Sequence, residues 1–288
     1  MNFNPVLIVL PILLLLMYDL GIEFKLKDVT QLAKHPKAVW IGLFAQIIGL
    51  PFVAILLGKI FTMEPYVFVG LVLIACSPGG SSSNMFTYIA KGDVTLAVTL
   101  TALSSVITVF TIPPILIYVI QTSGYGAIEN IQLPVGKLFM QNIVLLLLPI
   151  ALGMLTKRYS PNFAAKAKKV LDKSAFPALL ILATIFFITN KRIIIDNFGS
   201  LTFIVSLLII GAMILGIGLG YLGRLKDAQR RTIAIEVGIQ NAAQAIAVAS
   251  SPFILNDNKV AVPAIIYALM MNVILLTYIS KYIFKKKN

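Results

Sequence analysis

Long apolar stretches alternate with short clusters of charged residues along the whole sequence. Nine of these stretches come close to or exceed the roughly 20 residues that an α-helix needs to cross the hydrocarbon core of a bilayer. The longest connections, residues 121–137 and 157–173, leave room for one short surface helix each and for no separate soluble domain. The pattern therefore predicts an all-α polytopic membrane protein with about nine transmembrane helices, at residues 5–22, 38–60, 66–90, 94–120, 138–156, 175–190, 201–222, 232–252 and 260–283.

The composition agrees with this fold class and excludes several others. Of the 288 residues, 59% are hydrophobic and 12% are charged, whereas soluble domains carry about 25% charged residues. A soluble protein of this composition would expose large apolar patches and aggregate. The single cysteine and the single histidine permit no internal disulfide and are too few for a zinc or haem site. We therefore expect a lipid bilayer as partner, with no nucleic acid and no obligate protein partner.

The positions of the 24 lysines and arginines predict the orientation of the chain. Cytoplasmic loops of membrane proteins are enriched in these residues. With the N-terminus outside and nine spans, all of them fall on the inner side except Lys59, Lys137, Lys191, Arg192 and Lys259. The distribution predicts a multi-pass protein of the cell membrane with its N-terminus outside and its C-terminus in the cytoplasm. It also accounts for the formal net charge of +13 without an anionic polymer as partner.

The third span contains residues that interrupt a helix. Pro78 removes a backbone donor and clashes with the preceding turn, and Gly79 and Gly80 weaken the helix further. In hydrocarbon, freed backbone groups are tolerated only where they line a cavity or meet protein partners. Two interpretations stay open, a structural kink or re-entrant turn and a broken helix whose ends hold an ion or a substrate.

The eighth span contains an acid, Glu236, followed by Gln240, Asn241 and Gln244. A glutamate that faces lipid costs at least a few kcal/mol, so Glu236 must face a polar interior, carry a proton or pair with a cation. Either it is a structural acid bonded to its neighbours, or it binds an ion. Carboxylate, amide and hydroxyl oxygens are hard ligands, and a single carboxylate suits a monovalent ion better than calcium. The expected ion is sodium or a proton.

The third and eighth spans cross the membrane in opposite directions in the predicted topology. Interrupted helices at corresponding places in two inverted halves are typical of the midplane binding sites of secondary transporters. The two interruptions together therefore favour a transporter over a purely structural role for either one.

The motifs at these two interruptions resemble those of the bile acid:sodium symporter family. The resemblance rests on the residues 75–84 and 236–241, Ala-Cys-Ser-Pro-Gly-Gly-Ser-Ser-Ser-Asn and Glu-Val-Gly-Ile-Gln-Asn, and on the turn His35-Pro36-Lys37. It extends from about Leu20 to the ninth span. It implies one transmembrane transporter domain over residues 1–288, built from inverted repeats with two crossing broken helices. Spans 2–4 and 7–9 would form the core, and spans 1, 5 and 6 the panel.

The resemblance also implies two sodium sites that share Glu236. The first site would use Ser83, Asn84, Thr101 and Glu236. The second site would use Gln46, Glu236 and Gln240, together with the backbone oxygens of Val237 and Ile239. Where the family has a serine one turn before Thr101, this chain has Ala97. The first site therefore lacks one hydroxyl ligand, and the second site is the more complete of the two.

Substrate contacts implied by the resemblance lie at the ends of the broken helices and in the last span: Ser81, Asn241 and Asn272. Helix N-termini carry partial positive charge and suit a carboxylate or sulfonate. The expected function is sodium-coupled symport of an organic anion by alternating access. The anion would be bile-salt-like or a small carboxylate such as pantoate or a keto acid, and Na⁺ as coupling ion would be the only cofactor.

Three other interpretations remain. A carrier of the same fold could couple transport to protons through Glu236, or export arsenite, for which Cys76 would be the natural ligand. An intramembrane enzyme would need a His–carboxylate metal pair or a serine–base pair within the spans, and the sequence offers neither. Asp19, near the inner end of the first span, is expected to be a solvated acid at the membrane interface rather than a proton carrier.

Overall fold

The computed structural model describes residues 6–24, 36–80, 82–128, 136, 140, 143–251, 255 and 257–284. Within these ranges the secondary structure is helical, apart from a single β-bridge between Gly79 and Gln240. The elements are α1 (Val6–Glu23), α3 (Pro36–Phe44), the π-helical turn η1 (Ala45–Gly49), α4 (Leu50–Ile60), α5 (Pro65–Cys76), α6 (Ser82–Ile89), α7 (Val94–Thr122), α8 (Tyr125–Ile128), the π-helical turn η2 (Ile143–Leu147), α10 (Leu148–Tyr159), α11 (Pro161–Thr189), α12 (Lys191–Leu222), α13 (Asp227–Gly238), α14 (Ala242–Ser250) and α15 (Val262–Phe284).

The predicted all-α membrane class is confirmed. Among the described residues, four helical segments are long and apolar enough to cross a membrane: Pro36–Ile60, Val94–Thr122, Lys191–Leu222 and Val262–Ser280. The first of these is continuous through α3, η1 and α4. The count of nine spans stays a prediction.

Two helices are longer than predicted. The basic connection at residues 157–173 is not a short surface helix, because α11 begins at Pro161 and continues without interruption to Thr189. Proline is favoured in the first turn of a helix, and the alanines and lysines that follow are strong helix formers. Helix α12 likewise begins at Lys191 and not near residue 201. The hydropathy pattern predicts where a helix enters the lipid, and both of these helices begin before that point.

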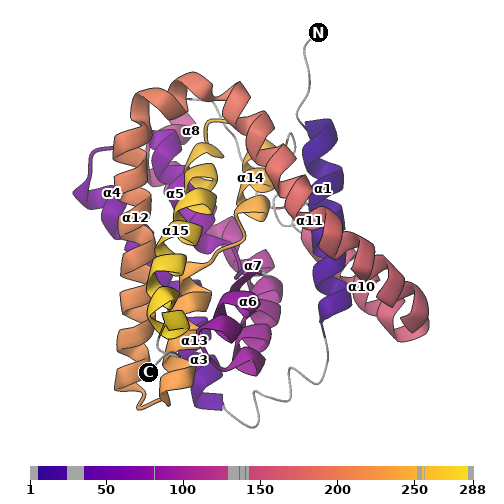
Figure 1. Ribbon diagram of the computed structural model, residues 1–288. Coiled ribbons are helices and arrows are strands. Elements are labelled where there is room, and N and C mark those ends of the chain that lie inside the picture. Colours follow the sequence, from indigo (N-terminus) through magenta and orange to yellow (C-terminus); the bar gives the residue numbers. More distant parts are fainter. Residues whose placement is uncertain are drawn as a thin grey trace.

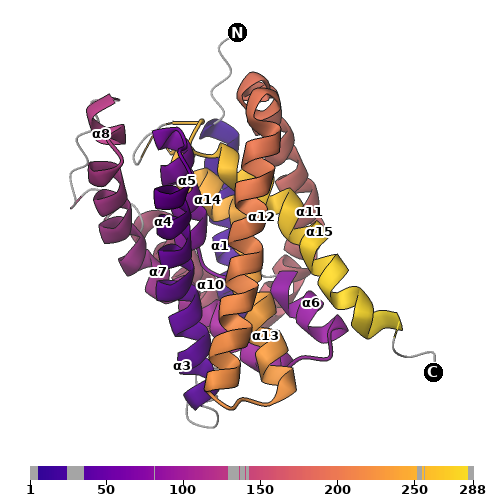
Figure 2. The ribbon, with the colours of Figure 1, turned by 90° about the vertical axis from the view of Figure 1, so that its left-hand side faces the viewer.

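The two interrupted spans occupy the centre of the bundle (Figures 1 and 2). Their halves α5 and α14 lie in the upper part of both views, and α6 and α13 lie in the lower part. Long helices flank them, with α12 packed on α13 and on α15, and α7 packed on α5, α6 and α13. The four helix ends therefore meet deep inside the molecule.

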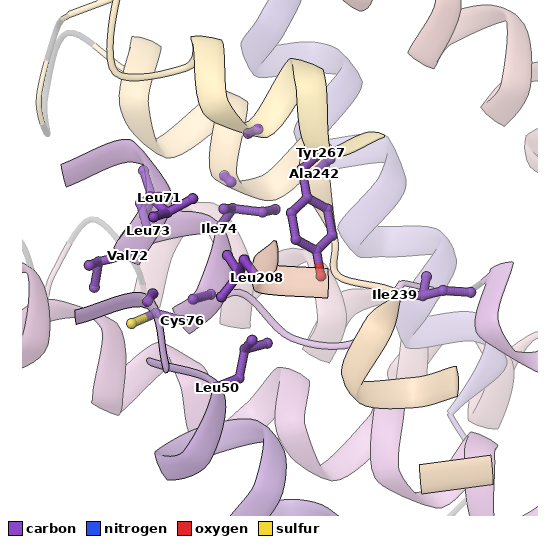
Figure 3. Packing of buried hydrophobic residues seen from close by; sticks show 14 of the residues in the cluster. Leu50, Leu71, Val72, Leu73, Ile74, Cys76, Leu208, Ile239, Ala242 and Tyr267 are labelled. Carbon is purple, nitrogen blue, oxygen red and sulfur yellow. The ribbon is translucent and has the colours of Figure 1, made fainter. Parts of the chain in front are cut away.

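A buried apolar layer surrounds the upper half-helices (Figure 3). Leu71, Leu73 and Ile74 of α5 are fully buried and lie beside Leu208 of α12 and Tyr267 of α15. Tyr267 carries the one hydroxyl group among the labelled side chains of this layer. A buried tyrosine hydroxyl normally finds a hydrogen-bond partner.

Helices α1, α10 and α11 pack against one another at one side of the molecule (Figure 1). At the contact between α1 and α10, a Cβ atom on Gly21 would collide with the carbonyl of Ile150, and a Cβ on Gly153 with the carbonyl of Tyr18. Small residues allow such close backbone approach between membrane helices. These three helices are the ones expected to form the panel, and their division from a core stays a prediction.

The C-terminal end of α1 is held by two lysines. Lys168 of α11 contacts Asp19 at 3.1 Å and Glu23 at 2.6 Å. Lys157 of α10 donates to the carbonyl of Ile22 at 2.6 Å, which supplies a partner to a helix end that lacks intrahelical ones. Asp19 is only 9% exposed. The expectation of a solvated acid was wrong, because an ion pair with Lys168 compensates the charge inside the protein.

Candidate functional site

The interruption in the third span begins where proline prevents the helix from continuing. Helix α5 ends at Cys76, and Ser77 is extended with φ −69° and ψ 153°, as expected for a residue that precedes proline. Helix α13 ends at Gly238, and Ile239 is also extended. Both interruptions that the sequence predicted are therefore present.

The two extended segments lie side by side and pair through their main chains. Gly80 N donates to Ile239 O at 3.1 Å, and Asn241 N donates to Pro78 O at 2.8 Å. We call residues 78–80 and 239–241 the crossing. The pairing satisfies backbone groups that the broken helices leave free, as buried backbone groups require.

Glycine is needed at one position of the crossing for a steric reason. A Cβ atom on Gly79 would collide with the carboxylate oxygen Oε1 of Glu236. The amide of Gly79 also donates to Ser104 Oγ of α7 at 3.4 Å. The absence of a side chain at Gly79 therefore lets the carboxylate lie directly against the backbone of the crossing.

Glu236 is the centre of the site. It is 0% exposed, and each carboxylate oxygen accepts a hydroxyl hydrogen bond. Ser83 Oγ of α6 donates to Oε2 at 2.5 Å, and Thr101 Oγ1 of α7 donates to Oε1. Three of the four residues expected in the first site are thus in direct contact, although they come from three helices.

Asn84 lies next to this cluster. Its Oδ1 atom is buried and has no hydrogen-bond partner in the described part of the chain. Asn84 and Thr101 line a small crevice, together with residues at and just after the C-terminal end of α1 and with Val98 and Ala102 of α7. Asn84 follows Ser83 in α6, and its buried, unpartnered oxygen is a hard ligand of the kind that an alkali cation takes.

The residues of the second site also meet at the crossing. Gln46 Nε2 of η1 donates to Gln240 Oε1 at 3.4 Å, and Gln240 Nε2 donates to Val237 O at 2.7 Å. Gln46 Oε1 is buried and unpartnered among the described residues. Gln46 and Gln240 are each 1% exposed. The site therefore offers amide, carboxylate and backbone oxygens, which are hard ligands suited to an alkali cation.

The sequence analysis did not predict the π-helical turn that carries Gln46. In this turn Leu50 N donates to Ala45 O, five residues earlier. Such turns are frequent at functional sites. The available signal was Pro51, whose missing N–H interrupts the regular α-helical hydrogen bonds in the middle of an otherwise unbroken apolar span.

Two buried hydroxyls near the crossing were also not predicted. Ser104 Oγ accepts from Gly79 N, and Tyr267 OH of α15 donates to Gly238 O at 3.0 Å. Neither lies in a motif. A polar side chain inside an apolar span needs a partner, and that need was the only indication in the sequence.

The three expected substrate contacts do not share one place. Ser81 lies outside the described residues. Asn241 caps α14, since its Oδ1 accepts from Gln244 N at 3.0 Å. Asn272 is exposed on α15, and its Nδ2 donates to Ala268 O of its own helix at 2.7 Å. Of the two described residues, only Asn241 is part of the crossing.

Comparison with known proteins identifies relatives of this chain. A family model described as the sodium bile acid symporter family matches residues 10–197. The P3 protein of Bos taurus is 32% identical over 251 residues, which are 85% of this chain and 51% of that protein. An uncharacterized sodium-dependent transporter of Bacillus subtilis, YocS, is 28% identical over 95% of this chain and 83% of its own length. The hepatic sodium/bile acid cotransporter of Rattus norvegicus is 30% identical over 82% of this chain and 65% of its own.

The chain spans about half the length of the P3 proteins it matches. The relatives whose names state an activity are transporters or cotransporters, and none of those named here is an enzyme. The family match covers the crossing residues of the third span together with Gln46 and Thr101, while Glu236 and Gln240 lie beyond it. The chain belongs to the sodium bile acid symporter family.

Proposed function

We propose that this protein is a secondary transporter that couples the inward movement of sodium to that of an organic anion. The observation that carries the proposal is the arrangement of oxygens around Glu236. A buried carboxylate accepts from two hydroxyls, and the buried Gln46 Oε1 and Asn84 Oδ1 have no partner within the described ranges. Sodium at the first or second site would supply those partners and compensate the carboxylate charge.

Coupling requires that sodium and the anion favour the same conformation. The main-chain bonds of the crossing support this, because they connect the residues of the sodium sites to Asn241 at the start of α14. A cation bound at Glu236 would fix the crossing, and the fixed crossing would present the ends of the broken helices to the anion. The core would then rock against the panel around the occupied site.

The substrate proposed is an organic anion, either bile-salt-like or a small carboxylate such as pantoate or a keto acid. Names among the relatives support the broad class, since the rat protein is a sodium/bile acid cotransporter and plant relatives are probable sodium/metabolite cotransporters. Arsenite export is less well supported, because Cys76 is buried within α5 and packs in the apolar layer of Figure 3.

Uptake by purified protein in proteoliposomes tests the proposal. Uptake of labelled pantoate, pyruvate and taurocholate should rise with an inward sodium gradient and not with an equal potassium gradient. Glu236→Gln keeps the shape of the side chain but removes the charge, so sodium-stimulated uptake should fall to background. Asp196→Asn removes an exposed carboxylate at the start of α12 and should leave uptake unchanged.

A second measurement needs no substrate. Sodium that binds only the folded protein raises its thermal stability, so the melting temperature in detergent should increase with sodium for wild type and not for Glu236→Gln. Gln46→Ala and Gln240→Ala should weaken the sodium response less, since each removes a neutral ligand. A wild-type protein that responds to pH and ignores sodium would replace this proposal with proton coupling through Glu236.

A further inference from the structure

The backbone oxygens expected in the second site lie at the end of α13, on Val237 in its last turn and on Ile239 directly after it. A helix end leaves its final carbonyls without intrahelical partners, and buried carbonyls need partners. The partners can be followed one residue at a time. Val237 O accepts from Gln240 Nε2 at 2.7 Å, Ile239 O accepts from Gly80 N at 3.1 Å, and Gly238 O accepts from Tyr267 OH at 3.0 Å.

Tyr267 differs from the other two donors in its origin. Gln240 and Gly80 belong to the crossing itself, whereas Tyr267 belongs to α15 and to the apolar layer of Figure 3. Its side chain is 0% exposed, so water does not replace the hydroxyl as a donor. The bond joins a continuous helix to the point where α13 stops.

We infer that Tyr267 is a positioning residue for sodium binding at the second site. Its hydroxyl holds the carbonyl of Gly238 toward α15 and thereby fixes the peptide plane between Gly238 and Ile239. The flanking carbonyls of Val237 and Ile239, which accept from Gln240 Nε2 and Gly80 N, then keep their orientation at the crossing. The inference rests on the proposed function, because it assigns a role at the sodium site proposed above.

Loss of this hydroxyl would leave Gly238 O buried without a donor, which is an unfavourable state. The peptide plane is then free to rotate in search of another partner, and rotation moves both neighbouring carbonyls. Groups that orient the ligands of a metal typically change its affinity by about 10- to 100-fold when they are removed. For Tyr267→Phe we expect the sodium concentration for half-maximal stabilisation to rise about tenfold.

Tyr267→Phe tests the inference, because phenylalanine keeps the ring and its packing and removes only the hydroxyl. The sodium titration of the melting temperature in detergent is the first readout. The second is the Michaelis constant for the organic anion at saturating sodium, which should stay at the wild-type value. A general loss of structure would lower the melting temperature without sodium and would not shift the sodium midpoint selectively.

Tyr125→Phe is a matched control. Tyr125 lies in α8, away from the crossing (Figure 1), and is also buried. Its hydroxyl donates to Asp257 Oδ2 at 2.5 Å. This variant should lose stability without a change in the sodium midpoint. If Tyr267→Phe does not accumulate as folded protein, Tyr267→Met provides a second variant without the hydroxyl, since methionine adapts to irregular space in a core.

The possible results separate the inference from the proposed function. A wild-type protein without any sodium response would overturn the sodium sites themselves. A normal wild-type response, with the same sodium midpoint in Tyr267→Phe, would overturn the positioning role alone. An equal shift in Tyr125→Phe would also overturn it, because the effect would then follow from any lost buried hydroxyl bond.

Discussion

At the scale of single residues, the two hydroxyl bonds to Glu236 determine how the carboxylate behaves without a cation. Ser83 and Thr101 each donate to one oxygen, so the group is oriented but its charge is not neutralised. A neutral donor stabilises a buried carboxylate far less than an opposite charge does. In the proposed function, a bound sodium ion would compensate this charge and take up the oxygen lone pairs that remain.

The alanine one turn before Thr101 gives a prediction at this scale. Ala97 is buried on α7. It lies four positions before Thr101, and residues four apart share one face of a helix. Ala97→Ser would add a hydroxyl near the first site. If that site binds sodium, half-maximal uptake should need a several-fold lower sodium concentration, because one more oxygen ligand is available. A sodium titration of uptake measures the change.

The control for Ala97→Ser is Ala102→Ser, which adds a hydroxyl to another residue of α7 at the edge of the crevice. It is expected to leave the sodium midpoint unchanged. An unaltered midpoint in Ala97→Ser would mean that the first site is not used in this protein, or that another group completes it.

The side chains at the site were predictable where a motif carried them and unpredictable where only packing did. Ser83 and Glu236 stood in two motifs, and their contact is present. Tyr267 could not be predicted, because its role depends on which helix lies opposite the end of α13. A one-dimensional pattern contains no information about that neighbour.

At the scale of elements, the close contact between α1 and α10 depends on two glycines. The carbonyls of Ile150 and Tyr18 occupy the space that side chains at Gly21 and Gly153 would need. Lys157 and Lys168 add polar bonds at the C-terminal end of α1. The C-terminal turns of α1 are thus held by close backbone packing on α10 and by polar bonds to lysines of α10 and α11.

Gly153→Ala should therefore destabilise the protein. The added methyl group would meet the backbone of α1, and forcing extra volume into a close-packed contact costs about 1–3 kcal/mol. Thermal unfolding in detergent is the measurement. Gly218→Ala in α12 is the control, since a Cβ there has no neighbour within 4 Å, and alanine favours a helix by about 0.5–1 kcal/mol over glycine. Equal stability of the two variants would contradict the packing argument.

The sequence was sufficient to predict which segments are helical or interrupted, but not where each helix begins. Pro78 and the two glycines after it predicted the interruption in the third span, and Glu236 with Gly238 predicted the one in the eighth span; both are present. The start of α11 at Pro161 was missed, because its first half is basic and hydropathy alone does not distinguish a charged helix from a loop. The π-helical turn was missed since its only signal is a proline one turn later.

At the scale of the whole molecule, predicted inner connections gather at one end. Arg231 at the start of α13 donates to the carbonyl of Lys91 at 2.8 Å, and Asp93 N donates to Thr232 Oγ1 at 2.7 Å. The turn before α7 is therefore in contact with the first half of α13. The lower part of Figure 1 also contains the turn between α12 and α13. Which end faces the cytoplasm stays a prediction from charge.

A pair of fusions at the C-terminus tests this orientation. Alkaline phosphatase, which folds only outside the cytoplasm, should be inactive there, and green fluorescent protein at the same position should fluoresce. The reason is the concentration of lysines and arginines in the connections assigned to the inner side. An active phosphatase fusion would reverse the orientation or change the number of spans from odd to even.

The main-chain pairing between Gly80 and Ile239, and between Asn241 and Pro78, bears on where the protein can bend. Interruptions in helices usually supply the flexible points of a membrane transporter, because unpaired peptide groups can change their torsion angles at little cost. Here four of those groups are already paired between the two extended segments of the crossing. The interruptions are thus expected to stay rigid through the transport cycle, and the bending has to be supplied by the connections at the ends of the long helices.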